Sequence, residues 1–196
     1  MRHDLRLEGY AFALRPVTLE DAEFIVQVRT SDPRRVRYLH PISPDVQAQR
    51  DWIATYLERE NDYYWVIERQ DTQAAEGLIG IYNLAPVERT GEWGRWVLKP
   101  GSLAAIESAW LVYRAGFESL QLDSVYCLTL ANNRPVVSFH DSCGLQPVAL
   151  LKNHFQFDGQ QHDAVKHLCS RATWPAVSRR LEPQAQAIAK RFHSMK

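Results

Sequence analysis

The sequence predicts an α+β fold: a central mixed, mostly antiparallel and twisted sheet of about seven strands, flanked by four helices, with one more helix at the C-terminus. Two observations predict it. Three β-rich segments follow one another so closely that an antiparallel meander is the simplest connection. After them, helical and strand-like segments alternate up to a final hairpin.

The N-terminal segments begin with a strand over residues 10–15. Thr18–Asp21 has the pattern of a capping box, so a helix follows, and Asp32-Pro33 ends it. Ser43-Pro44 starts a second helix, with Ser as N-cap and Pro at the first helical position.

The meander comprises strands over residues 63–68, 77–84 and 92–98. Apolar residues then recur every three or four positions over residues 106–120, which predicts a helix of about four turns. Residues 124–130 are rich in β-formers and predict the next strand.

The C-terminal part begins with a short helix that Asn133 caps and Gly144 ends. Residues 147–157 and 162–169 predict a β-hairpin. We expect one domain over residues 1–174, followed by an amphipathic helical tail over 175–196. The tail is basic, and it packs on the body or on a second subunit, or it contacts an anionic surface. Packing on the body or on a second subunit is favoured over an anionic surface, because basic runs are usually solvated faces.

Composition excludes several classes of protein. The 196 residues include 23 basic and 23 acidic side chains, without the basic excess of a protein that coats nucleic acid. There is no apolar run of about 18 residues, so we expect no membrane span. The N-terminus lacks the apolar segment of a signal peptide. The three cysteines are widely spaced, which favours free thiols in a reducing cytoplasm.

The most informative segment is the strand over residues 92–98 and the helix start that follows it. The first N–H groups of a helix have no partner within the helix, and together with the helix dipole they form an anion site. The sequence therefore predicts a site for the pyrophosphate of a nucleotide-like cofactor between residues 100 and 106.

The ordered elements and their residues resemble the GNAT superfamily of acyl-CoA-dependent N-acetyltransferases. The resemblance is closest to the branch with ribosomal-protein N-terminal and nucleotide-aminosugar acetyltransferases. It covers about residues 10–174, and the segments that carry it are Leu14–Ala22, Gly91–Leu98, Ala131–Asn133 and Cys143–Leu145.

This resemblance implies acetyl-CoA as co-substrate. We expect no metal, because His162, His167 and Cys169 have no further ligand motif and a hairpin would put them partly on different faces. The family's pyrophosphate loop, usually Gln/Arg-x-x-Gly-x-Gly/Ala, aligns with residues 100–105, where only Ala105 matches the pattern. Backbone amides do the binding, so small residues suffice. The expected contacts to acetyl-CoA are the strand edge at Trp96, Val97 and Leu98 and the loop residues Gly101, Ser102, Leu103, Ala104 and Ala105.

Two side chains are candidates for the chemistry. Glu92 is the expected general base for the amine, in the position where the family often places a carboxylate; the alternative is a solvated charge at a strand end. By the two-residue period of a strand, Glu92, Gly94, Trp96 and Leu98 share one face.

His140 is the expected general acid for the departing thiolate, because the family often has a Tyr four residues before Gly144. A helix C-terminus and the neighbouring Asp141 favour its imidazolium form. Alternatively, His140 is a packing residue without a chemical role, and Ser138 or Ser142 contacts the thiolate. Asn133 binds the pantetheine or simply caps its helix.

The acceptor is expected to be a primary amine of a small molecule. Aromatic and arginine side chains favour a nucleotide-linked aminosugar; these residues are Trp52, Tyr56, Tyr63, Tyr64, Trp93, Arg15, Arg37, Arg50 and Arg95. The same aromatics would equally serve as core. A protein N-terminal amine, a non-catalytic acyl-CoA-binding module and a homodimer stay open as alternatives.

Overall fold

The computed structural model describes residues 3–32, 37–157 and 159–194. One mixed sheet has eight strands in the order β1-β2-β3-β4-β5-β6-β8-β7. The strands are β1 (Leu7–Glu8), β2 (Phe12–Pro16), β3 (Tyr63–Arg69), β4 (Ala75–Ala85), β5 (Thr90–Leu98), β6 (Ser124–Leu130), β7 (Gln146–Phe157) and β8 (Gln160–Ser170). The predicted fold class is confirmed, with one strand more than expected. The extra strand, β1, has two residues, too few for a period to be visible in the sequence.

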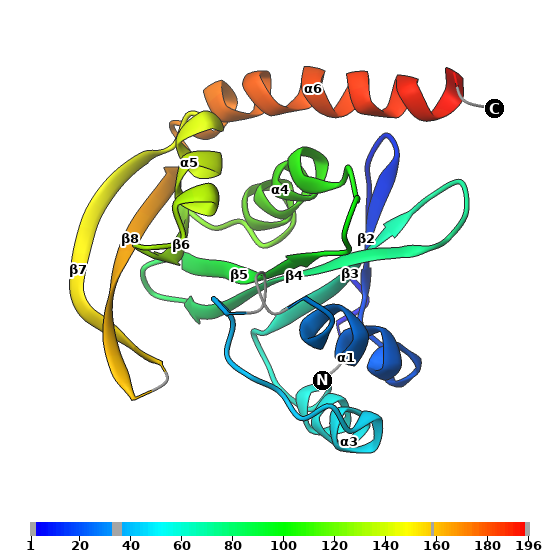
Figure 1. Ribbon diagram of the computed structural model, residues 1–196. Helices are drawn as coiled ribbons and strands as arrows, with labels where there is room; N and C mark the ends of the chain where they lie inside the picture. The colour runs from blue at the N-terminus through cyan, green and yellow to red at the C-terminus, as the bar shows by residue number, and fades with distance from the viewer. Residues whose placement is uncertain (1–2, 33–36, 158, 195–196) are drawn as a thin grey trace.

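Every neighbouring pair of strands is antiparallel except β5 and β6, which are parallel. The predicted meander is therefore β3-β4-β5. At one edge, β7 and β8 form a long hairpin that curves away from the rest of the sheet (Figure 1).

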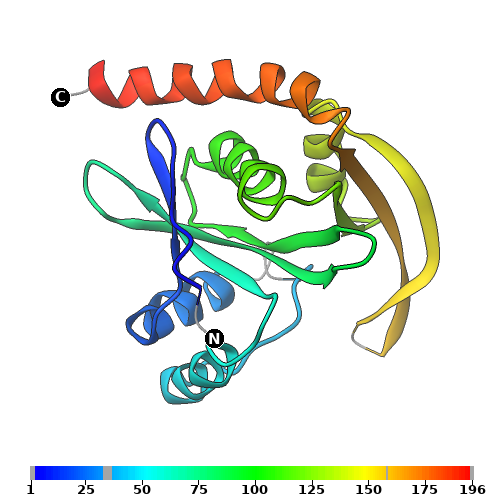
Figure 2. The same ribbon diagram turned by 180° about the vertical axis from the view of Figure 1, so that it is seen from behind.

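The helices are α1 (Ala22–Thr30), α3 (Val46–Tyr56), α4 (Ala105–Arg114), α5 (Arg134–Ser142) and α6 (Trp174–Ser194). α4 and α6 cover one face of the sheet, and α1 and α3 lie on the opposite face (Figures 1 and 2). Each face has its own core. Tyr113 and Leu181 belong to the core under α4 and α6, and Ile25 and Ile53 to the core under α1 and α3.

Two helix boundaries differ from the prediction. α3 begins two residues later than expected, because Asp45 is its N-cap and accepts the Gln47 N–H at 2.8 Å. The helix predicted over residues 106–120 is regular only to Arg114, and a π-helical turn (Ala115–Ser119) follows. The expected stop at Pro33 lies outside the described residues, although α1 ends at Thr30.

The C-terminal helix α6 packs on the body through its apolar stripe. Leu181 is fully buried, and the Trp110 indole N–H donates to the Ser178 hydroxyl at 3.0 Å. One turn further along α6, on the same side of the stripe, the Tyr10 hydroxyl donates to Glu182 at 2.6 Å. Within the described residues, no helix combines the length and apolar character needed to cross a membrane.

Candidate active site

The sheet opens between its two parallel strands. β5 and β6 pair only at Thr90–Glu92 with Ser124–Tyr126. Beyond that point β5 stays paired with β4 up to Leu98, and β6 stays paired with β8 up to Leu130. From Trp93 to Val97, the edge of β5 that faces β6 therefore offers backbone groups that no strand of the described residues uses.

A β-bulge in β5 changes which side chains face each side of the sheet. Gly94 pairs with Gly80 and Val97 with Leu78, so Arg95 and Trp96 together oppose one residue of β4. Arg95 has a φ of 52°, in the left-handed region. The expected common face of Glu92, Gly94, Trp96 and Leu98 is therefore wrong: the bulge interrupts the alternation between Glu92 and Trp96.

Side-chain contacts show toward which face of the sheet each of these residues points. The indole N–H groups of Trp93 and Trp96 both point to α4, to the Tyr113 hydroxyl at 3.0 Å and the Ser108 hydroxyl at 3.2 Å. Glu92 is directed to the other face, where its carboxylate contacts β4. Of the expected pantetheine contacts, Trp96 lines the cavity that lies in this opening, whereas Val97 and Leu98 do not line it.

The start of α4 carries the backbone donors that the sequence predicts. Among the described residues, no protein acceptor contacts the N–H groups of Leu103, Ala105 and Ile106. Ser102 and Ala104 are different, because their N–H groups donate to the Lys99 carbonyl at 3.1 Å and to the Ser102 hydroxyl at 3.2 Å, so the prediction that these two are free donors is wrong. Gly101, with a φ of 82°, forms the turn that leads into the helix.

Glu107, in the first turn of α4, does not occupy these donors. Its buried carboxylate points back to the turn before β2, where it accepts the N–H groups of Ala11 at 3.0 Å and Phe12 at 3.2 Å, as well as that of Tyr10. Burial raises the pKa of this carboxyl group, and the three backbone bonds oppose that rise. The helix start therefore stays open to an external anion.

Asn133 lies at the N-cap of α5, but its side chain makes no capping hydrogen bond. Its backbone carbonyl accepts the N–H groups of Val136 and Val137, and the residue lines a cavity. The interpretation of Asn133 as a side-chain cap is therefore wrong, and the amide is available to a ligand.

The cavity has a volume of about 510 Å³ and extends through the opening between β5 and β6. Trp93, Trp96 and His140 line it on the α4 side. Glu92 and Arg29 line it on the α1 side. The segment Tyr38–His40 after α1, the end of β6 (Cys127–Leu130) and His154 and Phe155 of β7 complete the wall.

Glu92 is buried in this wall and held by two donors from β4. The Tyr82 hydroxyl donates to one carboxylate oxygen at 3.2 Å, and the Asn83 amide donates to the other at 3.0 Å. Burial and the Glu92 charge both raise the pKa of Tyr82, so its hydroxyl keeps its proton. Glu92 is thus a fixed carboxylate in a cavity, not a solvated charge at a strand end.

His140 lies on the opposite wall, with only 2% of its surface exposed. Burial, with the neighbouring His167, lowers its pKa to about 3. The expected imidazolium is therefore wrong: desolvation outweighs the helix dipole, and the ring is neutral near pH 7. Asp141 does not contact it, because Asp141 pairs with His167 at 3.1 Å.

The neutral ring of His140 packs among aromatic side chains and one thiol. It meets Trp93 edge-on at a centroid distance of 5.2 Å. Its Nε2 lies 3.5 Å from the Cys127 sulfur, and its buried Nδ1 has no hydrogen-bond partner among the described residues. Burial raises the pKa of Cys127 far above its usual value, so this thiol is protonated and can donate to His140.

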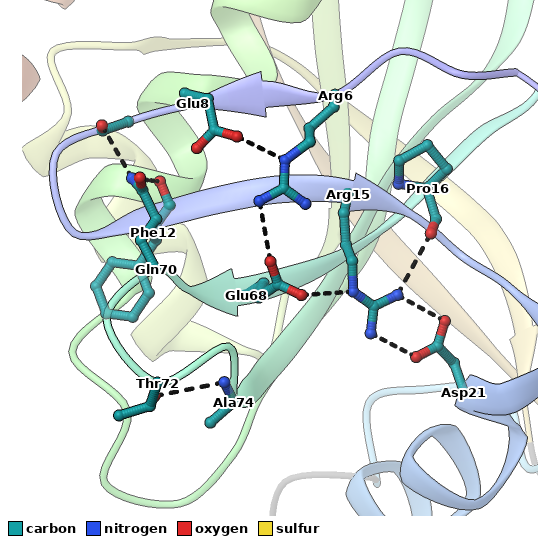
Figure 3. A network of polar contacts seen from close by, with 11 residues as sticks. Arg6, Glu8, Phe12, Arg15, Pro16, Asp21, Glu68, Gln70, Thr72 and Ala74 are labelled. Carbon is teal, nitrogen blue, oxygen red and sulfur yellow. Dashed lines mark hydrogen bonds and ion pairs between the residues drawn. The ribbon is translucent and has the colours of Figure 1, made fainter.

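Arg15 is a structural residue, contrary to its expected contact with the acceptor. Its guanidinium bridges Asp21, at 2.7 and 2.8 Å, and Glu68, at 2.7 Å (Figure 3). Both carboxylates are buried, and Arg6 contacts the second oxygen of Glu68 at 3.0 Å. The cluster joins β2 to β3 and to the start of α1.

Most of the other residues expected to contact the acceptor are also paired, exposed or part of a core. Arg95 lines the cavity but is held by both oxygens of Asp62 and lies 4.4 Å from the Tyr82 ring centroid. Arg37 and Arg50 are exposed and do not line the cavity. Of the five expected aromatics, only Trp93 lines it, whereas Trp52, Tyr56, Tyr63 and Tyr64 pack in or against the cores.

The sequence prediction missed Arg29, Tyr82, Asn83 and His167. Tyr82 and Asn83 follow the apolar run of β4, and an Asn at a strand end adjoining a carboxylate-bearing strand was the available signal. Arg29 is one of many arginines, and nothing local distinguishes it. Across the described residues, no group of three His, Cys, Asp or Glu side chains is arranged to hold a metal ion.

Comparison with known proteins places this site in a family. The chain matches the acetyltransferase (GNAT) domain family over residues 12–146. It resembles a nucleotide-linked sugar GNAT, apo FdhC, with a TM-score of 0.75, 28% identity, and coverage of 91% of this chain and 99% of that one. No curated protein matches the sequence.

Two further solved structures are similar. A proposed acetyltransferase from T. thermophilus has a TM-score of 0.79 and 25% identity, covering 94% of this chain and 98% of that one. A single-residue mutant of the spermidine N-acetyltransferase SpeG of Vibrio cholerae has a TM-score of 0.73 and 16% identity, covering 85% and 97%. The last likeness concerns the fold alone. The family match extends over more than half of the chain, so this protein belongs to the GNAT acetyltransferase family.

Proposed function

We propose that the protein transfers an acetyl group from acetyl-CoA to a primary amine of a small molecule, by direct attack of the amine on the thioester. The parting of β5 and β6 beyond Glu92 and Tyr126 carries this proposal. It brings an open strand edge and a buried carboxylate to one cavity, and β5 leads from that cavity to the free donors at the start of α4.

The residues fit the parts of acetyl-CoA. The N–H groups of Leu103, Ala105 and Ile106 would hold the diphosphate, because backbone donors at a helix start bind anions. The edge of β5 from Trp96 to Leu98 and the Asn133 amide would bind the pantetheine amides. A backbone N–H near Trp96 would donate to the thioester oxygen as negative charge develops there.

Glu92 would accept a proton from the ammonium form of the acceptor, directly or through one water. The free amine then attacks the carbonyl carbon, the C–N bond forms and the C–S bond breaks. The second proton of the nitrogen passes to the departing sulfur, which leaves as the thiol, and Glu92 then releases its own proton to water. Tyr82 and Asn83 would keep Glu92 oriented during these steps.

His140 would act on the sulfur as a neutral hydrogen-bond donor, since its pKa near 3 leaves no imidazolium at neutral pH. We expect His140→Phe to lower kcat more than it weakens acetyl-CoA binding. Equal activity in steady-state kinetics would remove this role.

For the acceptor, we propose a nucleotide-linked aminosugar. The similarity to a nucleotide-linked sugar GNAT, at 28% identity over nearly the whole chain, supports it. The charge of the cavity supports it too. Within the described wall, Glu92 is the single carboxylate, and the charge of Arg29 offsets it while Arg95 is already paired with Asp62, which does not favour a polyamine. A protein N-terminal amine is the second candidate, because nothing in the described wall opposes it.

The test is release of CoA, detected with a thiol reagent, from acetyl-CoA and a panel of amines. The panel holds nucleotide aminosugars, N-terminal peptides, polyamines and aminoglycosides. Steady turnover with one of the first group supports the proposal, and turnover with peptides alone supports the second candidate. Acetyl-CoA binding without any turnover would instead indicate a non-catalytic acyl-CoA-binding module.

A further inference from the structure

We infer that Arg29 is the anion-binding residue of the acceptor site, where its guanidinium holds an oxyanion group of the acceptor. This inference rests on the proposed function for the identity of the ligand as an acceptor. The anion site itself depends only on the contacts of Arg29.

Arg29 lies in the last turn of α1, on the same face of the sheet as Glu92, and lines the cavity. Its side chain is held on two sides. One terminal nitrogen donates to the backbone carbonyl of His40 at 2.5 Å. The guanidinium also contacts the hydroxyl of Tyr64, whose ring is buried under α3. Arg29 is therefore positioned before any ligand arrives.

Within the described part of the chain, nothing neutralises the charge of Arg29. No carboxylate there forms an ion pair with it, and its buried Nε has no hydrogen-bond partner. Arg15 has Asp21 and Glu68, and Arg95, the other arginine of the cavity wall, has Asp62. Arg29 thus differs from Arg15 and Arg95, two of the four arginines that the sequence had suggested as acceptor contacts.

The end of α1 accounts for part of this arrangement, because a cation near a helix C-terminus is stabilised by the dipole. The dipole does not supply the missing acceptor for Nε, nor does it require the side chain to line the cavity. Arg29 as a whole is half-buried, but its Nε is buried, and a buried polar atom without a hydrogen bond is costly. The missing partner is therefore an anion that enters the cavity.

The chemistry of a guanidinium limits the choice of that anion. Its planar fork matches the oxygens of a phosphate or a carboxylate, with two parallel hydrogen bonds. Because the guanidinium lies beside the buried ring of Tyr64 and its Nε is buried, this attraction is stronger than on a fully exposed surface. The same charge repels an acceptor that carries only amines.

The test measures binding without turnover. Uridine diphosphate and, separately, aspartate are titrated by calorimetry into the protein at saturating CoA, which occupies the donors of α4. The variants are Arg29→Gln, Arg29→Lys and the control Arg50→Gln, an exposed arginine of α3 that does not line the cavity. Thermal melting of each variant checks that it is folded.

We expect one probe to bind the wild type and Arg50→Gln equally. Arg29→Gln should bind it about 10- to 100-fold more weakly, as expected for loss of charge-assisted hydrogen bonds. The affinity of Arg29→Lys for the probe should fall between those of the wild type and Arg29→Gln. If the affinity for uridine diphosphate depends on Arg29, the anion is a phosphate. If the affinity for aspartate depends on it, the anion is a carboxylate. Equal affinities for the wild type and Arg29→Gln, or no binding of either probe, would overturn the inference.

The result is separable from the proposed function. If no amine is acetylated but anion binding still depends on Arg29, the anion site stands and the proposed reaction fails. If amines are acetylated and Arg29→Gln leaves the KM of anionic acceptors unchanged, the reaction stands and the role of Arg29 fails.

Discussion

The two sides of the cavity are built in different ways. On the α4 side, the proposed acetyl-CoA contacts are backbone groups: free N–H donors at the start of one helix and the open edge of one strand. On the α1 side, the contacts are side chains from separate segments, with Glu92 from β5, Tyr82 and Asn83 from β4, and Arg29 from α1. The contacts on the α4 side require only that the strand and helix follow each other in this order. The contacts on the α1 side require particular side chains.

This difference explains which substitutions should matter. A backbone site tolerates the loop over residues 100–105, which retains little of the family pattern, because the N–H groups persist whatever the side chains are. A side-chain site changes its ligand when one residue changes. The acceptor side should therefore respond to conservative substitutions and the acetyl-CoA side mainly to those that block its donors.

The largest effect is expected for Glu92→Gln, which keeps the shape but removes the base. We expect kcat/KM to fall about 100-fold or more, with the greatest loss at low pH, where the acceptor is mostly ammonium. The measurement is the pH profile of kcat/KM, with Glu118→Gln, an exposed residue far from the cavity, as control. An unchanged profile would reject Glu92 as the base.

Arg15→Gln should affect stability and not the acceptor. It leaves the buried carboxylates of Asp21 and Glu68 without their shared partner, and we expect a loss of about 2–3 kcal/mol in the free energy of unfolding. Arg6→Gln, at the exposed side of the same cluster, should cost less than about 1 kcal/mol. Urea unfolding measures both. A raised acceptor KM with unchanged stability would contradict the structural role of Arg15.

His140→Phe should change the pH dependence of stability. The folded-state pKa of about 3 lies below the unfolded value of about 6.5, so the unfolded chain binds a proton first as the pH falls. The wild type therefore loses stability from about pH 6.5 downward, by about 2 kcal/mol at pH 5. The variant lacks this contribution. Urea unfolding measures the free energy of unfolding of both proteins at pH 7 and at pH 5. The difference between the wild type and the variant should change by about 2 kcal/mol between the two pH values. The same difference at both pH values would contradict a neutral His140 ring.

Sequence and structure agree best where local pattern suffices. The strand over Ser124–Leu130 has the predicted bounds, and the capping box at Thr18 is present. Glu92, Trp96, Asn133 and His140 all line one cavity, because the order of elements brings them there.

The failures come from interactions between distant segments. The bulge at Arg95 reversed the face of Trp96, and such a register shift is visible only in the pairing with β4. The state of His140 depends on desolvation by Trp93 and neighbouring β8, which no local rule reveals. Arg15 is neutralised by Glu68, more than fifty residues away, so a list of arginines could not separate it from Arg29.

The smallest expected effect tests the acetyl-CoA side. Leu103→Asp places a carboxylate beside the free donors of α4, where it competes with the diphosphate. Leu103 is 46% exposed, so the fold should tolerate the change. We expect acetyl-CoA to bind about tenfold more weakly, equivalent to about 1.4 kcal/mol. Val87→Asp, at a fully exposed turn, is the matched control.

The most direct measurement is a calorimetric titration of these three proteins with acetyl-CoA. Backbone donors at the start of α4 that hold the diphosphate predict clear binding to the wild type and to Val87→Asp, and weaker binding to Leu103→Asp. No heat with the wild type, or the same affinity for all three, would contradict a diphosphate site there.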